Sequence, residues 1–413
     1  MEGEPQTATF EDLSIDDSLG ALARVRQYGT SAIALQRLVH VKMLTEAAES
    51  VPYESIQTDL FPLLRALSTD NEWVIRQHLG EQLGGVAAAC LREAEGEDGP
   101  GYRGIIESIL PLIQTLLNDS QDEVRQSSGA SLCHICSLLA PEDRGRRALT
   151  LALQLAHDDE QEELRMTAAK LLNDIVEILG PDLCTQFVSP ELVSLAEDPV
   201  FRVRKAAALA LHSACRVAGE ADAVDRLLPA FIRLTKDDIY RVRKACAEAL
   251  VDMSAAVSPG LRGHVLLEVF TRLAGDASKL VRQAAMQQLG PFLSTLPAAK
   301  VSDALLEMFA GMAAADTGDP TLDRDMRGYC AYNLPGVMAA VGPSRWRPFL
   351  KEAYGRLVRD GVWTVRRTLA CSLHEMVRVM GGRGPGPEGG PGKKMEGRRG
   401  SGEEGVWRAT RSG

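Results

Sequence analysis

The sequence has few aromatic residues and no long apolar run. Phe, Tyr and Trp make up 5% of the 413 residues, whereas hydrophobic residues as a whole make up 45%. This balance is typical of helices that pack through alanine and leucine. No apolar run approaches the roughly 20 residues that a membrane-spanning helix needs. The first residues, MEGEPQTATFEDLSIDD, are acidic and polar, so we expect neither a signal peptide nor a membrane partner.

The sequence also lacks an excess of positive charge. Its formal net charge is −10 at pH 7. A general nucleic-acid binder neutralises phosphates with a broad basic face. We therefore expect no nucleic-acid partner.

Catalytic and metal-binding motifs are missing as well. We find no glycine-rich phosphate loop after a strand, no HExxH motif and no serine nucleophile elbow. The seven histidines are scattered without ligand spacing, and the only CxxC motif, Cys133 to Cys136, has no second pair to complete a zinc site. We expect no enzyme activity, no cofactor and no metal.

The eight cysteines stand mostly among Ala and Leu, as small buried hydrophobes do. This usage is typical of a reducing compartment. It predicts a cytoplasmic protein, with the nucleus left open as a second location.

A repeat of about 39 residues organises the chain. Arginines in one common frame follow each other at steps of 39, 49, 40, 39, 39, 39, 45 and 39 residues: Arg37, Arg76, Arg125, Arg165, Arg204, Arg243, Arg282, Arg327 and Arg366. Seven residues after each frame arginine stands a leucine: Leu44, Leu83, Leu132, Leu172, Leu211, Leu250, Leu289, Leu334 and Leu373. Six residues before it, seven copies carry aspartate: Asp70, Asp119, Asp159, Asp198, Asp237, Asp276 and Asp360. Such a period indicates a stacked repeat protein.

Each unit reads as two helices joined by a turn at the aspartate. The segment before the aspartate is periodic and apolar, as in residues 105–117, and the Val-Arg pair opens a second helix, as in residues 203–217. Small residues three and four places after the arginine allow close helix packing, and the leucine fills the core. The fold class is therefore all-α, a right-handed curved solenoid of about nine helix pairs.

The repeat also sets the domain boundaries. We expect a disordered amino terminus over 1–15, one solenoid over 16–380 with loop insertions at about 93–104 and 313–320, and a disordered Gly/Pro-rich tail over 381–413. No polar capping unit follows the last repeat. We therefore expect its second helix to expose an apolar face, as part of a longer array would.

The aspartates and arginines at the turns predict an ion-pair ladder. We assign to it Asp198, Arg204, Asp237, Arg243, Asp276 and Arg282, each arginine reaching the aspartate of a neighbouring unit. A charged stripe that binds a partner is the alternative, and it stays open.

One turn position carries large aromatic residues. Trp73, Phe201, Tyr240 and Trp363 each stand three residues before a frame arginine. Basic residues lie beside them or in the same row: Arg202, Arg241, Lys279 and Arg367. Aromatic residues with arginine are typical of interface hot spots. We predict a partner-binding surface at Trp73, Phe201, Arg202, Tyr240, Arg241, Lys279 and Trp363, with packing between repeats as the alternative for the rings.

The pattern resembles HEAT repeats over about residues 16–380. The stretches VRKACAEAL, LVRQAAMQQLGPFLSTL and WTVRRTLACSLHEM resemble the regulatory subunit 1 family of protein phosphatase 4, and more distantly the HEAT scaffold subunit of type 2A phosphatases. The long acidic insert of that family, between the repeats around Arg282 and Arg327, is missing here.

The resemblance implies a non-catalytic scaffold whose partners are a serine/threonine phosphatase catalytic subunit and phosphoprotein substrates. A cargo or nuclear-transport adaptor built of HEAT repeats is the alternative. Acidic or Trp/Asn rows on the concave helices would favour it.

Overall fold

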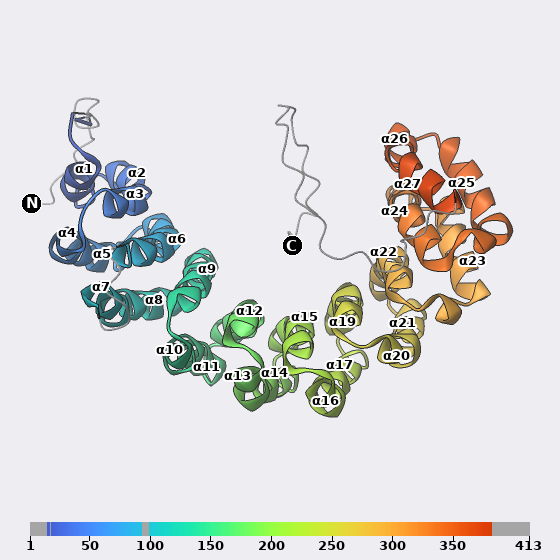
Figure 1. Ribbon diagram of the computed structural model, residues 1–413, viewed down its shortest axis with the longest axis horizontal. Helices are drawn as coiled ribbons and strands as arrows, with labels where there is room; N and C mark the ends of the chain where they lie inside the picture. The colour runs from blue at the N-terminus through green and yellow to red at the C-terminus, as the bar shows by residue number, and fades with distance from the viewer. Residues whose placement is uncertain (1–14, 17, 93–98, 382–413) are drawn as a thin grey trace, which may run out of the picture.

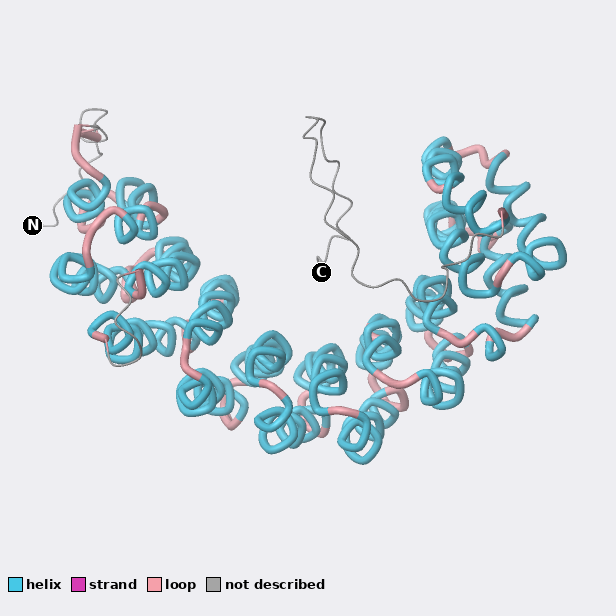
Figure 2. Tube along the Cα trace, viewed as in Figure 1, coloured by secondary structure: helices cyan, strands magenta, loops and turns pink. Residues whose placement is uncertain are grey.

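The described part of the chain is a curved stack of antiparallel helix pairs. The computed structural model describes residues 15, 16, 18–92 and 99–381, and no strand occurs among them. Figure 1 shows the pairs following one another along an arc, and Figure 2 shows helices joined by short loops. The segments 1–14, 93–98 and 382–413, on which the expectations of disorder and part of the first loop fall, lie outside the described residues.

The second helices of the pairs line the inner side of the arc (Figure 1). They are α2 (Ala34–Val41) with α3 (Leu44–Glu49), α6 (Trp73–Cys90), α9 (Asp122–Leu138), α12 (Glu162–Leu179), α15 (Phe201–Ala218), α18 (Tyr240–Glu248) with α19 (Leu250–Ala256), α22 (Lys279–Thr295), α24 (Pro320–Val341), and α26 (Trp363–Cys371) with α27 (Leu373–Met380).

The first helices form the outer side and most contain one wide π-helical turn. They are α1 (Ala21–Tyr28), α4–α5 (Tyr53–Ser55, Phe61–Leu67), α7–α8 (Pro100–Gly104, Leu110–Leu117), α10–α11 (Pro141–Asp143, Thr150–Ala156), α13–α14 (Pro181–Leu183, Ser189–Ala196), α16–α17 (Glu220–Asp222, Leu228–Leu234), α20–α21 (Pro259–Leu261, Leu267–Ala274), α23 (Asp303–Gly311) and α25 (Lys351–Val358).

Proline follows the wide turn in four units. Pro62, Pro111, Pro190 and Pro229 each follow it, at the first or second position of the helix segment that resumes. Proline has no N–H, and its ring clashes with the carbonyl one turn earlier. Widening that turn keeps the outer helix continuous in direction.

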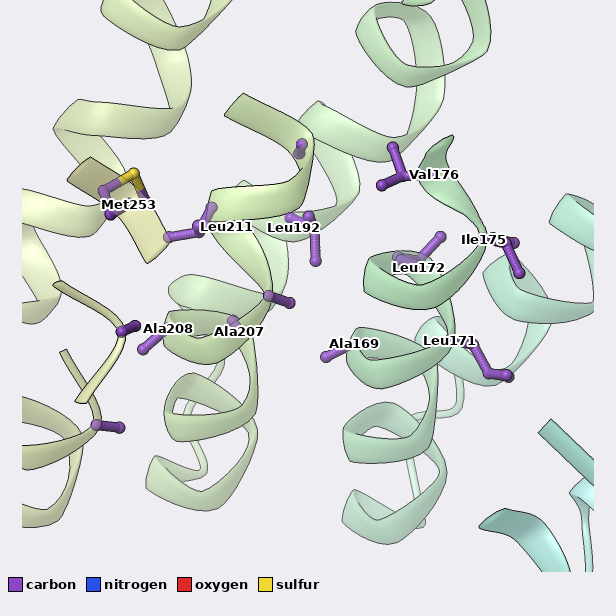
Figure 3. Close-up of a cluster of buried hydrophobic side chains, with 14 of the residues drawn as sticks. Ala169, Leu171, Leu172, Ile175, Val176, Leu192, Ala207, Ala208, Leu211 and Met253 are labelled. Atoms are coloured by element: carbon purple, nitrogen blue, oxygen red, sulfur yellow. The ribbon is translucent and has the colours of Figure 1, made fainter. Parts of the chain in front are cut away.

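The frame leucines show where the core runs. The first eight, from Leu44 to Leu334, are fully buried. Figure 3 shows Leu211 among Ala207, Ala208, Leu192 and Met253, which come from two successive units. The side chain of Leu373, the ninth, is 45% exposed because no further helix pair covers α27 in the described structure.

Two loop predictions need correction. Pro100–Gly104, expected to be loop, forms helix α7, and its buried Gly101 approaches Cys90 so closely that a Cβ there would lie 2.0 Å from the Cys90 carbonyl oxygen. The second loop is shorter than expected, because 312–314 form a 3₁₀ turn and Pro320 already begins α24. In both places a proline at the first helical position starts the helix early, since its fixed φ is helical.

Candidate functional site

The frame arginines bridge the inner turns of successive helix pairs. Arg204 donates from Nε and Nη2 to the Asp237 carboxylate at 2.7 and 3.1 Å, and from Nη1 to the Asp198 carbonyl oxygen of its own turn at 2.8 Å. Asp237 Oδ1 also accepts the backbone N–H of Ile239, just before α18 begins, at 2.8 Å. Each arginine therefore ties one turn to the next.

The same bridge recurs at other joints of the stack. Arg243 pairs with Asp276 at 2.7 Å, and the matching pairs are Arg37–Asp70, Arg76–Asp119, Arg165–Asp198 and Arg327–Asp360. The guanidinium of Arg243 donates to Asp276 and holds the pKa of that carboxyl below its ordinary value. The side chain of Asp276 is only 9% exposed, and its carboxylate is engaged in this ion pair within the fold.

The ladder is not continuous. Arg282, assigned to it from the sequence, donates only to the backbone carbonyl oxygens of Asp276 and Ala277, because its unit is followed by the longer loop that has lost the aspartate. The repeat around Arg165 also differs, since Asp158, not the expected Asp159, holds the turn. That turn is one residue longer than the others.

The aromatic turn position lies on one edge of the stack. Trp73, Phe201, Tyr240 and Trp363 are the first residues of α6, α15, α18 and α26, and Lys279 is the first residue of α22. Helices α6 and α26, which begin with Trp73 and Trp363, lie near opposite ends of the described array (Figure 1). Only Phe201, Tyr240 and Lys279 come from successive units, so they are the part of the row that can form one contiguous surface.

Exposure separates the four rings into two kinds. Trp73 is 38% and Trp363 60% exposed, whereas Phe201 and Tyr240 are half-buried and pack against the core. The Arg241 guanidinium lies 5.9 Å from the Phe201 ring and 5.8 Å from the Tyr240 ring, within cation–π range of both. Phe201 and Tyr240 thus take part in packing between repeats and also lie beside the positive charge of Arg241 at the solvent-exposed edge.

Sequence reasoning missed two apolar residues of this surface. Ile239, just before α18, is 37% exposed, and Leu280, in the first turn of α22, is 44% exposed. Ile239 stands one residue before Tyr240, and Leu280 one residue after Lys279. Their position next to the aromatic turn position was the sequence signal that could have identified them. We use the name central ridge for Phe201, Arg202, Ile239, Tyr240, Arg241, Lys279 and Leu280.

The ridge changes charge toward the amino end. Arg202 forms an ion pair with Glu162 of α12, so part of its charge is already compensated. The turns before it carry exposed acids, among them Asp122 and Glu163. Within residues 99–300, the turns that begin α15, α18 and α22 are therefore the part of this row where positive charge lies beside exposed apolar side chains.

The cysteine pair is structural. Cys136 is buried and Cys133 half-buried, and burial raises the pKa of their thiols to about 11 and about 12. A thiol with so high a pKa is a poor nucleophile and a poor metal ligand at neutral pH. Within the described ranges, no three His, Cys, Asp or Glu residues are placed to hold a metal ion. No helix there is both long and apolar enough to span a bilayer.

Comparison with known proteins identifies the class of the fold. The HEAT repeat family model matches residues 109–139 and 227–257. The solved structure of importin beta superposes on 87% of this chain and 47% of its own, with a TM-score of 0.63 and 14% sequence identity. A Kap95:Nup1 complex gives a TM-score of 0.61 at 16% identity, over 84% of this chain and 46% of that one. The chain is an all-helical HEAT-repeat solenoid.

A more specific similarity is local. Serine/threonine-protein phosphatase 4 regulatory subunit 1 from Homo sapiens is 44% identical over 61 residues, which are 15% of this chain and 6% of the relative. The Mus musculus protein matches equally. The match spans a small part of the relatives' length. It links this chain to HEAT-repeat scaffolds.

Proposed function

We propose that this protein is a non-catalytic scaffold that holds a type 2A-family serine/threonine phosphatase catalytic subunit, similar to that of protein phosphatase 4, and directs it to phosphoprotein substrates. The observation that carries the proposal is the 44% identity over 61 residues to a phosphatase 4 regulatory subunit. The solenoid supports it, because its turns line up along one edge as a long surface for protein contact. The proposed location is the cytoplasm, with the nucleus as a second compartment.

The central ridge is the proposed contact with the catalytic subunit. Ile239 and Leu280 offer exposed apolar area, and Arg241 and Lys279 offer positive charge beside it. A buried apolar centre with charged groups around it is the usual anatomy of a protein interface. The complementary surface on the partner is therefore apolar with acidic residues at its edge. Trp73 and Trp363 are proposed as outlying contacts.

The transport adaptor is the weaker alternative. The likeness to importin beta at 14% identity concerns the fold alone. At one exposed position of the second helices, five places after the frame arginine, three of the units carry Glu81, Lys170 and Tyr332, which do not form an acidic or Trp/Asn row. This position therefore gives no support to cargo binding.

The test is a matched pair of double variants. Ile239→Ala/Leu280→Ala removes apolar side chains from the ridge, and the control Phe187→Ala/Val224→Ala removes side chains of similar exposure, 45% and 42%, outside it. Binding to the purified protein phosphatase 4 catalytic subunit is measured by titration. The ridge variant should lose about 2–4 kcal/mol of binding free energy, which is about 30-fold or more in Kd, and the control should bind as the parent does.

Phe201→Ala/Tyr240→Ala is the complementary variant. Because both rings are half-buried, this change should lower stability as well as binding, so unfolding is measured beside capture. Equal binding by the ridge variant and its control would remove the ridge as the site. Failure of the parent protein to bind the phosphatase would remove the proposed function itself.

A further inference from the structure

The joint between the third helix pair, α7–α9, and the fourth, α10–α12, lacks the ion pair that ties most other joints. Arg125 is only 4% exposed, yet its Nε donates to the hydroxyl of Thr167 at 3.2 Å, and its Nη2 to Asp122 of its own helix at 3.2 Å. Of these two Arg125 bonds only the one to Thr167 crosses the joint, and its acceptor is a neutral group. On the outer side the Tyr102 hydroxyl of α7 donates to the Asp143 carboxylate of α10 at 2.8 Å. The Arg125–Thr167 contact is one hydrogen bond to a neutral hydroxyl, whereas an Arg–carboxylate pair adds a second parallel bond and an opposite charge.

The longer turn explains why no carboxylate reaches Arg125. Arg165 donates to the carbonyl oxygen of Asp158, seven residues earlier, where Arg204 and Arg243 reach back six. The extra residue lets Asp158 Oδ1 accept the backbone N–H groups of Glu160 and Gln161 at 3.1 and 2.6 Å. Asp158 thus closes a turn that is one residue longer than that of Asp237, and no ion pair joins its carboxylate to Arg125.

Packing at this joint is also weaker than at its neighbours. On the outer side a hollow of about 100 Å³ separates α8 from α11, lined by Gln114, Leu117, Asn118, Leu151, Gln154 and Leu155. The exposed amides of Gln114 and Gln154 span it at 3.2 Å. On the inner side, α9 packs less extensively on α12 than on α6. Few apolar contacts and water-accessible polar bonds mark places that open at low free-energy cost.

Gly129 of α9 is in close contact with Leu171 of α12. A Cβ on Gly129 would lie 2.9 Å from Leu171 Cδ2. The joint after Arg282 also lacks an ion pair. There, however, a Cβ on Gly290 would lie 2.5 Å from the Cβ of Asn333, and helices α22 and α24 pack extensively. Of these two joints without an Arg–Asp ion pair, only the α9–α12 joint also has second helices that pack less extensively than those of both neighbouring joints.

We infer that the α9–α12 joint is a hinge of the solenoid. The helix pairs before it swing as one body about the Gly129–Leu171 contact, and the outer hollow between α8 and α11 opens and closes with the motion. The hinge lies between Trp73 and the central ridge, so it sets their separation. It would act whatever the partner is, and so goes beyond the proposed function.

Distance distributions between spin labels test the hinge in the full chain. In a Cys371→Ser background, labels at Glu72→Cys and Ala277→Cys span the joint, and labels at Lys205→Cys and Ala277→Cys lie on one side of it. All three label sites are exposed turn or surface positions. We expect a clearly broader distribution for the pair that spans the joint. Equal widths for the two pairs would overturn the inference.

Restoring a carboxylate at the joint is the decisive variant. Thr167→Asp places an acid where Arg125 Nε already donates, and should narrow the spanning distribution without changing the other pair. Thr167→Val is the matched control and should not narrow it. Deletion of Glu160, which returns the turn to its usual length, is an independent route to the same narrowing and serves if Thr167→Asp does not fold. Unchanged width in the folded variant would refute the hinge.

Ion pairing elsewhere supplies the converse test. Asp237→Asn removes the acceptor of Arg204 at a well-packed joint and should broaden the Lys205/Ala277 pair. If that distribution keeps its width, the Arg–Asp pairs do not stiffen the stack, and the reasoning for the hinge fails.

Discussion

Two frame leucines allow one substitution to be compared at a covered and at an uncovered position. Leu211 and Leu373 both stand seven residues after a frame arginine, but Leu211 is fully buried and Leu373 is 45% exposed. Leu211→Ala removes three carbon groups, worth about 2.4 kcal/mol at about 0.8 kcal/mol each. The cavity left among Ala207, Ala208 and Met253 raises the loss of unfolding free energy to about 2–5 kcal/mol.

Leu373→Ala is the matched control. The same atoms are removed, but the side chain already contacts water and leaves no enclosed cavity, so the loss should stay below about 1 kcal/mol. Chemical denaturation followed by circular dichroism compares the two variants. Because a stack need not unfold in one step, amide hydrogen exchange is measured as well.

Hydrogen exchange tests the locality of the damage. Each repeat contacts only its neighbours, so Leu211→Ala should lower protection in α12, α15 and α18 and leave α6 and α26 unchanged. Equal destabilisation by the two substitutions would refute the assignment of the frame leucines to the core between repeats. Loss of protection spread evenly over the chain would refute the one-dimensional picture of its stability.

Three further outcomes follow from the same geometry. Asp276→Asn should cost about 1–3 kcal/mol at pH 7, because it leaves Arg243 without its carboxylate. The pKa of Asp276 is lower in the folded state, so its contribution to the free energy of unfolding is fully present above the unfolded pKa of about 3.9 and is lost as pH falls through the folded value. The difference in stability between variant and parent should therefore vanish in acid denaturation experiments well below pH 4. Val377, on the last helix α27, is 62% exposed, so the parent protein should self-associate as measured by light scattering. Val377→Asp should reduce the self-association, and a parent that is monomeric at all concentrations would contradict this prediction. Of the eight cysteines only Cys371 is exposed, so a thiol reagent should modify one site rapidly in the folded chain and none in Cys371→Ser; several fast sites would show that the core is open.

The sequence alone determined the architecture and the repeat. Periodic Arg, Leu and Asp positions are local signals that every unit repeats, so the all-helical solenoid and the core position of Leu211 followed from spacing. The pairing of Arg204 with Asp237 could also be predicted, because the period brings equivalent turns side by side. The aromatic slot was found in the same way, from its concentration at one turn position.

Tertiary structure decided what depends on the neighbouring unit. Phe201 and Trp363 occupy the same slot in sequence, yet one is half-buried and the other is 60% exposed, because burial is set by the pair that packs alongside. Asp158 takes the place of the expected Asp159 because this turn holds one extra residue, and its Oδ1 accepts the backbone N–H of Gln161. The 40-residue step from Arg125 to Arg165 shows the extra residue, but only the structure shows which aspartate closes the turn. The looseness of the α9–α12 joint has the same origin. Side-chain fit across an interface depends on the three-dimensional path of both helices, which the repeat spacing does not encode.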